Sequence, residues 1–222
     1  SLAEKYERNS LRELRKKGEF TCPVCSEQVI LKIGTKRIPH FAHKRGLFCT
    51  EQYDRESDYH EQGKLKLFEW LKYLGLAPKL EPYFPTIKQR ADVSFEYGEK
   101  TYCVEFQCST INEELFRKRT DGYTKLHMQP IWILAGNHIN RKKSSLISLS
   151  GFQYLFSNRN ASLQWYIPSY CPISDQFIFL HSISPVSIRN AYANVKIHSL
   201  YSLKLEGFLN PHNKDNIPFI QW

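Results

Sequence analysis

Two carboxylates face each other in the segment "ADVSFEYGEKTYCVEFQCS", residues 91–109. Alternating apolar and polar residues predict two short strands, and Gly98 with Glu99 suits the two-residue turn of a type II′ hairpin. That turn places Asp92 opposite Glu105 on the two strands. Facing carboxylates repel and destabilise a strand pair, but they are favourable when a divalent cation binds between them.

Gln107 extends this polar patch, because residues two apart on a strand share a face. Asp92, Glu105 and Gln107 therefore predict a site for a hard cation such as Mg²⁺ or Mn²⁺ on one face of a sheet. The alternative is an amphipathic edge hairpin whose polar face carries acids with no ligand.

A helix over residues 58–74 precedes the hairpin. Asp58 as N-cap and Glu61 three residues later resemble a capping box. Glu61 also shares a helical stripe with Leu65 and Phe68, which predicts a third carboxylate directed toward the sheet.

A second helix over residues 110–126 follows the hairpin, with Thr110 and Glu113 as a similar start signal. Leu115, Arg119 and Tyr123 share one stripe, so an arginine is directed inward as well. Buried charges of both signs need partners or a metal. An internal Glu61–Arg119 ion pair is the alternative to a metal site.

The chain order predicts a mixed α/β sheet. The apolar run "IWILAG" reads as a buried strand after the second helix, which completes a β-α-β unit. Short aromatic strands follow from about Gly151. We expect three regions: an N-terminal helix with a small metal-binding module (1–50), the core (51–140), and a basic, aromatic, β-rich C-terminal region (141–222).

Five candidate zinc ligands lie within the first region. Cys22, Cys25, His40 and His43 predict one tetrahedral structural Zn²⁺ site, and Cys49 is a competing ligand that could replace a histidine. A chance grouping of redox or buried cysteines is the alternative.

The composition favours a polyanionic partner. The net charge is +9, and residues 141–222 hold 8 basic against 3 acidic residues. Such an excess attracts nucleic acid, and interspersed aromatics suit stacking on single-stranded DNA. A merely solvated basic surface is the alternative. Short apolar runs predict no membrane insertion, residues 1–17 lack the apolar core of a signal peptide, and the six cysteines do not form a secreted framework, so we expect a cytoplasmic protein.

Two further residues could do chemistry. His60, at the start of the first core helix, could bind phosphate, although a single histidine there is more often packed or solvated. Cys103 shares the polar face of the hairpin, but no neighbouring base or helix end activates it as a nucleophile.

The order of these elements resembles the PD-(D/E)XK, or restriction-endonuclease-like, nuclease core. In detail the chain is similar to the competence protein CoiA family. The motifs "CPVC", "HFAH", "ESDYH", "ADV", "VEFQCS" and "RTDGY…IWIL" occur in that family's order. The match covers about residues 20–136 well and the rest loosely.

The resemblance implies roles for the site residues. Asp92 and Glu105 match the acids of the nuclease signature, and Gln107 stands where such nucleases usually have lysine. Glu61 matches an acid on the first helix, and Arg119 matches the arginine of the second helix. Glutamine can orient water but brings no positive charge, so metal binding is better supported than turnover.

The resemblance also implies a function. Relatives are linked to natural transformation, acting on incoming single-stranded DNA, here by Mg²⁺- or Mn²⁺-dependent phosphodiester hydrolysis, together with recombination or DNA-uptake proteins. The alternative is a catalytically weak or inactive DNA-binding accessory protein. A defence nuclease and a zinc-dependent interaction protein are further possibilities.

Overall fold

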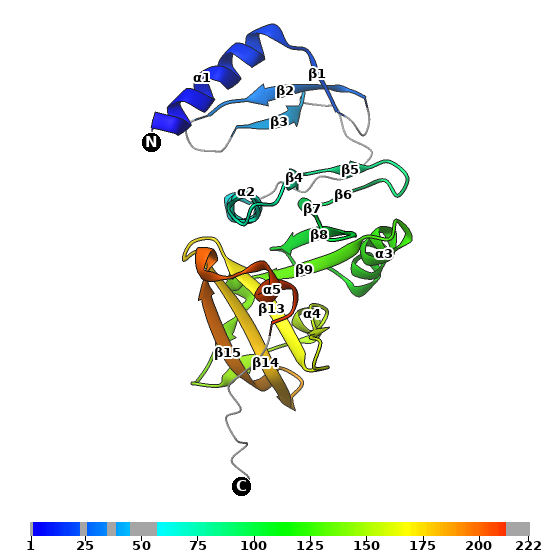
Figure 1. Cartoon of the computed structure of the whole chain (residues 1–222), viewed down its shortest axis with the longest axis vertical. Helices are drawn as coiled ribbons and strands as arrows, with labels where there is room; N and C mark the ends of the chain where they lie inside the picture. Colours follow the sequence, from blue (N-terminus) through cyan, green and yellow to red (C-terminus); the bar gives the residue numbers. More distant parts are fainter. Residues whose placement is uncertain (1, 23–25, 35–38, 45–56, 212–222) are drawn as a thin grey trace. The chain divides into compact units, whose positions relative to one another are not determined.

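A computed structural model describes residues 2–22, 26–34, 39–44 and 57–211 (Figure 1). The chain divides into two compact units, residues 1–61 and 62–222. Among the described helices, none combines the length and the apolar character needed to cross a membrane.

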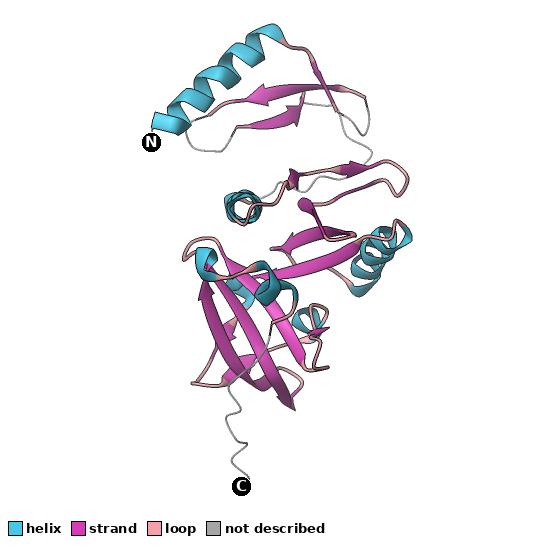
Figure 2. Cartoon of the chain, in the orientation of Figure 1, coloured by secondary structure: helices cyan, strands magenta, loops and turns pink. Residues whose placement is uncertain are grey.

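The first unit combines one helix with a small antiparallel sheet (Figure 2). Val29 and Leu31 are its buried strand residues, and the rings of Phe20 and Phe41 lie 5.0 Å apart. The predicted polar N-terminal helix is confirmed. Its elements are α1 (Leu2–Lys17), β1 (Phe20–Thr21), β2 (Gln28–Lys32) and β3 (His40–His43).

The second unit contains a ten-stranded mixed sheet, and the predicted mixed α/β fold flanked by helices is confirmed. Its main path has the order β10-β11-β15-β14-β13-β9-β8-β7-β4, with β12 paired to β13. The strands in this sheet are β4 (Lys79–Leu80), β7 (Val93–Tyr97), β8 (Lys100–Gln107), β9 (Gln129–Ala135), β10 (Asn140–Arg141), β11 (Leu146–Ser148), β12 (Asn158–Arg159), β13 (Trp165–Cys171), β14 (Gln176–Ser187) and β15 (Asn190–Ser199). A separate pair joins β5 (Tyr83–Phe84) to β6 (Gln89–Arg90).

Five helices and helical turns accompany this sheet in the described chain, and a sixth, α2, begins within the first unit. Their bounds are α2 (Asp58–Tyr73), α3 (Glu113–Lys125), η1 (Gly136–His138), α4 (Gly151–Tyr154), η2 (Leu200–Ser202) and α5 (Leu205–Leu209).

The predicted hairpin forms with the expected register. Val93 pairs with Val104 and Tyr97 with Lys100, and Gly98 in the turn has φ +60°. Only glycine adopts that conformation readily, as the first residue of a type II′ turn requires. Asp92 directly precedes Val93 and Glu105 directly follows Val104, so the two acids lie next to this pair, as the sequence predicted.

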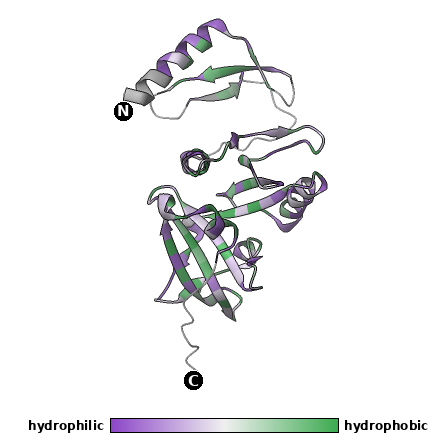
Figure 3. Ribbon diagram, in the orientation of Figure 1, coloured by the Kyte–Doolittle hydropathy of each residue, from purple (hydrophilic) through white to green (hydrophobic). Residues whose placement is uncertain are grey.

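Helices cover both faces of this part of the sheet. On one face α2 approaches β8 so closely that a Cβ at Gly63 would lie 1.9 Å from the Phe106 ring. On the other face Tyr123 of α3 packs with Cys103 of β8. Because both faces are covered, β9 carries consecutive buried apolar residues, Trp132 to Ala135. Figure 3 shows hydrophobic residues along the strands of this unit.

The predicted β-α-β unit is confirmed. β8 and β9 pair in parallel, with Glu105 opposite Trp132, and α3 connects them. The run that includes Ile133 and Leu134 is fully buried. The sheet then continues through β13, which is parallel to β9, into the antiparallel strands β14 and β15.

Both predicted helix starts are shifted. The Ser57 hydroxyl accepts from the His60 backbone N–H (3.2 Å), so Ser57 caps α2 in place of Asp58. The Asn112 side chain accepts from the Leu115 backbone N–H (2.8 Å), so Asn112 caps α3 in place of Thr110. In each case the polar residue immediately before the helix competes successfully for the exposed N–H groups.

The predicted inward stripe of α2 is wrong. Leu65 is 38% exposed, whereas Leu67, Trp70 and Leu71 are buried. Trp70 sets the rotation of the helix, because its indole N–H donates to the Leu203 carbonyl (3.2 Å) and its ring packs on aromatic residues of β14 and α5.

Candidate active site

Asp92 lies at the bend where β7 begins. Continuing the ladder would pair the Phe106 N–H with the Ala91 carbonyl, but Asp92 Oδ2 accepts that N–H at 2.7 Å. The backbone of residues 91–92 pairs instead with Glu81 and Pro82. β7 therefore leaves β8 at this point, and the Asp92 carboxylate is held beside the end of β8.

The same bend corrects one assignment from the alternation pattern. Alternation along residues 91–95 predicts that Ala91 shares a face with Val93, but Ala91 packs with Cys103 and Tyr123 on the α3 face. The period of two ends where the strand bends, so residues before Asp92 no longer follow it.

Glu105 is a buried carboxylate on the α3 side of β8, with 5% of its surface exposed. Its Oε1 accepts from the Arg119 guanidinium (2.5 Å) and from the Tyr123 hydroxyl. The same Arg119 nitrogen donates to the Arg90 carbonyl (3.0 Å). Both side-chain bonds fall on Oε1, so Oε2 is the oxygen of Glu105 that receives no hydrogen bond from the described residues.

This arrangement explains why Asp92 and Glu105 can lie next to each other. Arg119 balances one carboxylate and a backbone N–H binds the other. The Arg119 guanidinium forms its ion pair with Glu105. The arginine and tyrosine expected on the inward stripe of α3 do point inward, whereas Leu115 on that stripe is 45% exposed.

The surroundings shift the protonation of this cluster. Burial raises the pKa of Glu105 to about 7, with Asp92 adding to the rise and Arg119 opposing it. Burial alone would lower the pKa of Arg119, but the neighbouring Glu105 carboxylate outweighs this effect. The net pKa is raised, so the guanidinium stays charged. Burial and Glu105 also raise the pKa of Tyr123, which keeps the phenol protonated as a donor.

We expect Glu105 to make stability depend on pH. Because its carboxyl binds a proton more tightly in the folded state, stability should fall by ~1–3 kcal/mol as the pH rises from about 4.5 to about 7. Glu105→Gln keeps an acceptor for Arg119 and Tyr123 but removes the titration. Urea unfolding across this range should therefore show a flatter profile for Glu105→Gln, and an unchanged slope would contradict the assignment. The exposed Glu114→Gln on α3 is the matched control.

Gln107 ends β8 on the same face as Glu105. Its amide nitrogen donates to the carbonyl (2.9 Å) and hydroxyl (3.2 Å) of Ser109. The amide is thus oriented by the loop that leads to α3. Cys103, two residues before Glu105, is fully buried, and burial followed by Glu105 raises its pKa to about 12. A protonated thiol is no nucleophile, so Cys103 serves the core.

Sequence reasoning missed Glu81 and its partners. The Glu81 backbone N–H donates to the Asp92 carbonyl (2.9 Å), and its carboxylate contacts Lys64 (2.5 Å) and Arg90 (3.5 Å). Lys64 is buried. Glu81 lies in a proline-containing segment without regular periodicity, so the sequence offered no sign of this charged cluster beside Asp92.

Glu61 and His60 belong to the first unit as the chain divides. Both lie in the first turn of α2, where the Glu61 backbone N–H donates to the Ser57 carbonyl (3.0 Å). The second unit therefore brings together Asp92, Glu105 and Arg119.

The donor set at Asp92 and Glu105 fits a hard cation that keeps several waters. Within the described residues, no group of three or more histidine, cysteine, aspartate or glutamate side chains gathers as metal ligands. One or two carboxylates are nevertheless sufficient for Mg²⁺ when water and a substrate phosphate complete the shell. The pair with its open Glu105 Oε2 matches that requirement.

The predicted zinc ligands are only partly described. Cys25 and Cys49 lie outside the described residues. Cys22 begins the turn between β1 and β2, where its carbonyl accepts from the Ser26 N–H (2.8 Å). In β3, His43 pairs with Val29 near that turn, whereas His40 pairs with Lys32 at the other end of β2.

A mixed sheet with helices on both faces and paired acids where two strands separate defines a nuclease-like α/β domain. The nuclease-like domain of competence protein CoiA matches residues 56–213, and the N-terminal domain of competence protein CoiA matches residues 3–52. This chain therefore belongs to the competence protein CoiA family, as its motifs predicted.

A curated relative gives the same result. Competence protein CoiA of Bacillus subtilis (strain 168) is 35% identical over 207 residues, which cover 93% of this chain and 55% of the relative. The chain thus spans about half the length of that relative.

Proposed function

We propose that this chain acts on DNA as a divalent-cation-dependent phosphodiester hydrolase. The observation that carries the proposal is the pairing of Asp92 and Glu105 where β7 leaves β8. A hydrogen bond to the Phe106 N–H fixes Asp92, and Arg119 with Tyr123 fix Glu105. Two carboxylates held in place by hydrogen bonds are typical of a metal site rather than of the polar face of a surface hairpin.

Mg²⁺ or Mn²⁺ would bind to Asp92 and Glu105, with the carbonyl of residue 106 as an additional ligand. When bound, the metal polarises the phosphodiester and activates water. The role of the chain is to position oxygens. Since Arg119 and Tyr123 both bind Oε1, the orientation of the Glu105 carboxylate is set before any ligand arrives.

Protonation should regulate this site. A carboxyl group must be ionised to bind a metal, and the pKa of Glu105 is raised to about 7. Metal affinity should therefore rise with pH up to neutrality, where the carboxylate predominates. Arg119 remains charged throughout and can balance negative charge near the phosphate.

Gln107 would orient water near the phosphate. It does not bring the positive charge that a lysine at position 107 would supply. Arg119 is the cation on Glu105, and Lys64 is bound to Glu81.

A DNA-binding accessory protein with little or no cleavage is the second candidate. The observation that favours it is the Gln107 amide, whose nitrogen is already engaged by Ser109. An uncharged and engaged side chain at this position stabilises a phosphate transition state poorly.

We further propose single-stranded DNA taken up during natural transformation as the substrate, in the cytoplasm, with recombination or DNA-uptake proteins as partners. The family and the net charge of +9 support this. Labelled single- and double-stranded DNA, incubated with Mg²⁺, Mn²⁺ or chelator, tests the proposal. Cation-dependent cleavage supports the hydrolase, and binding without cleavage supports the accessory protein. If DNA is neither bound nor cleaved, both candidate functions are excluded.

The N-terminal unit is proposed to hold a structural Zn²⁺. Cys22 and His43 lie near the same turn, because His43 pairs with Val29 at the start of β2. They are proposed as two of the ligands, together with Cys25 and with His40 or Cys49.

We expect Cys22→Ser to remove stoichiometric zinc and to destabilise the N-terminal unit, because a structural zinc contributes directly to folding. Zinc content by elemental analysis and protease resistance of the unit measure the effect. Cys171→Ser in the second unit is the matched control and should keep its zinc. A zinc-free wild-type chain purified without chelator would contradict the proposal.

A further inference from the structure

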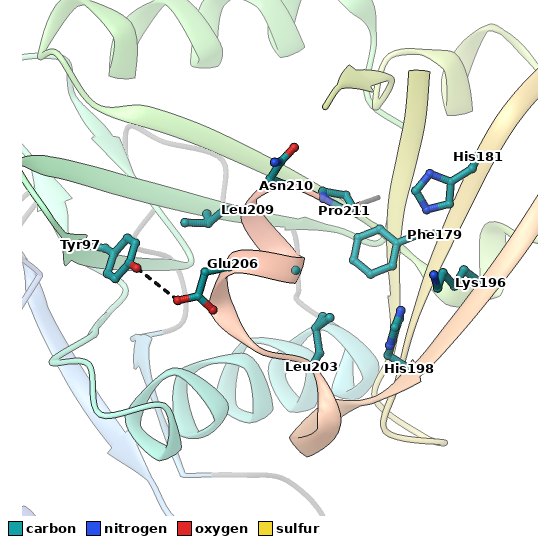
Figure 4. Close-up of a pocket in the computed structure, with 11 residues that line it drawn as sticks. Tyr97, Phe179, His181, Lys196, His198, Leu203, Glu206, Leu209, Asn210 and Pro211 are labelled. Carbon is teal, nitrogen blue, oxygen red and sulfur yellow. Dashed lines mark hydrogen bonds between the residues drawn. The ribbon is translucent and has the colours of Figure 1, made fainter. Parts of the chain in front are cut away.

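A cavity of about 490 Å³ lies between α5 and the strands β14 and β15, within the second unit (Figure 4). This volume falls within the range of roughly 300–1,000 Å³ that small-molecule sites occupy. Its polar and aromatic lining residues are Tyr97, Phe179, His181, Lys196, His198, Glu206 and Asn210.

The sheet wall of the cavity carries a lysine, two histidines and an aromatic ring. Phe179 of β14 pairs with Lys196 of β15, so their side chains share one face. His181 and His198 lie two residues farther along the same strands and face the same way (Figure 4). The rings of both histidines lie about 6 Å from the Phe179 ring.

This polar group interrupts an otherwise aromatic face. Nearer to α2, the same face carries Phe177, which packs on Trp70 and Phe208. Continued packing would call for apolar side chains at positions 181, 196 and 198, yet the chain has two histidines and a lysine there. Burial, followed by the neighbouring Lys196, lowers the pKa of His198.

The α5 wall supplies acceptors. Glu206 points toward the cavity and receives a hydrogen bond from the Tyr97 hydroxyl (3.3 Å). Asn210 at the end of α5 is fixed because its Oδ1 accepts from the Ala161 N–H (2.7 Å). A lysine and two histidines thus line one wall, and an amide and a carboxylate line the other.

We propose that this cavity binds one nucleotide of DNA, with the phosphate on the sheet wall and the base toward α5. Lys196 and His198 hold the phosphate, while the base contacts Phe179 and Tyr97 and presents its amino groups to Glu206. The phosphate and the base each meet side chains of complementary chemistry. A simple anion would use only the sheet wall, and an apolar ligand would use neither the lysine nor the glutamate.

The cavity is separate from the candidate active site. It lies on the face of the sheet that α2 and α5 cover, whereas Glu105 faces α3. It could therefore hold a nucleotide of a strand that is also bound elsewhere. The choice of DNA as the source rests on the proposed function, while the nucleotide chemistry rests on the cavity alone.

Titration of the whole chain with deoxyadenosine monophosphate, inorganic phosphate and a single-stranded oligonucleotide tests the inference. Asp92→Asn is used as the background so that the oligonucleotide remains intact. Lys196→Gln should weaken nucleotide or oligonucleotide binding about tenfold, the effect of losing a hydrogen bond to a charged group. The ring signals of His198 should shift in NMR spectra on binding. Lys143→Gln removes the same charge from an exposed loop and is the matched control.

If Lys196→Gln weakens binding of the monophosphate, the cavity is a site for free nucleotides. If Lys196→Gln weakens binding of the oligonucleotide alone, the cavity holds a nucleotide within a strand. Equal affinity for inorganic phosphate and the monophosphate would show an anion site only and overturn the proposal. Oligonucleotide binding that Lys196→Gln and Lys143→Gln leave unchanged would also overturn it, without affecting the hydrolase proposal. Failure of DNA to bind or be cleaved would overturn the hydrolase, while the monophosphate titration would still decide on the cavity.

Discussion

Asp92→Asn is expected to reduce cation-dependent DNA cleavage at least about a hundredfold while the chain stays folded. Loss of an outer partner of a metal ligand already costs roughly 10–100-fold, and Asp92 is proposed as a direct ligand. The asparagine Oδ1 can still accept the Phe106 N–H that Asp92 binds at 2.7 Å, so the bend before β7 should persist.

The control for this prediction is Asp121→Asn, which removes an exposed acid from α3. Both variants change the net charge equally, so a general effect on DNA attraction would appear in both. Cleavage rates at saturating Mn²⁺, together with urea unfolding, separate chemistry from folding. Full activity in Asp92→Asn would contradict the proposed metal site.

The hairpin shows what local sequence can determine. Its register follows from two local features, the Gly98 turn and the alternation of residues 93–97 and 100–106, and both hold in the structure. The β-α-β unit was equally predictable, because a buried apolar run after a helix has few alternatives in a sheet.

Tertiary partners determined the features that the sequence did not reveal. The rotation of α2 follows from Trp70, whose hydrogen-bond acceptor is Leu203, far away in the chain. Helix starts were misplaced by one or two residues because several capping residues stand side by side at Ser57 and Asn112. The partner of Arg119 depended on the distance between strand and helix, which no periodicity contains.

The site residues divide in the same way. Asp92 and Glu105 were found from their pairing on two strands. Glu81 was not, because its link to Asp92 is a backbone hydrogen bond between a short edge strand and a bend. The Glu81 side chain also forms an ion pair with Lys64, a buried residue of α2.

The buried ion pair of Glu105 and Arg119 should dominate the stability of the second unit. Arg119→Met leaves the Glu105 carboxylate buried without its cation, and breaking a buried pair in this way typically costs about 3–5 kcal/mol. The loss should shrink at low pH, because burial raises the pKa of Glu105 and a protonated carboxyl needs no cation. Urea unfolding at low and neutral pH measures both effects.

A double-mutant cycle distinguishes this effect from the loss of packing. Glu105→Gln combined with Arg119→Met removes both charges, and it should recover most of the stability that Arg119→Met loses at neutral pH. Arg117→Met on the same helix is the matched control: its exposed pair with Glu113 should contribute less than about 1 kcal/mol. If the double variant were as unstable as Arg119→Met at every pH, Arg119 would act through its packing. The charge balance that lets Asp92 and Glu105 lie side by side would then need another source.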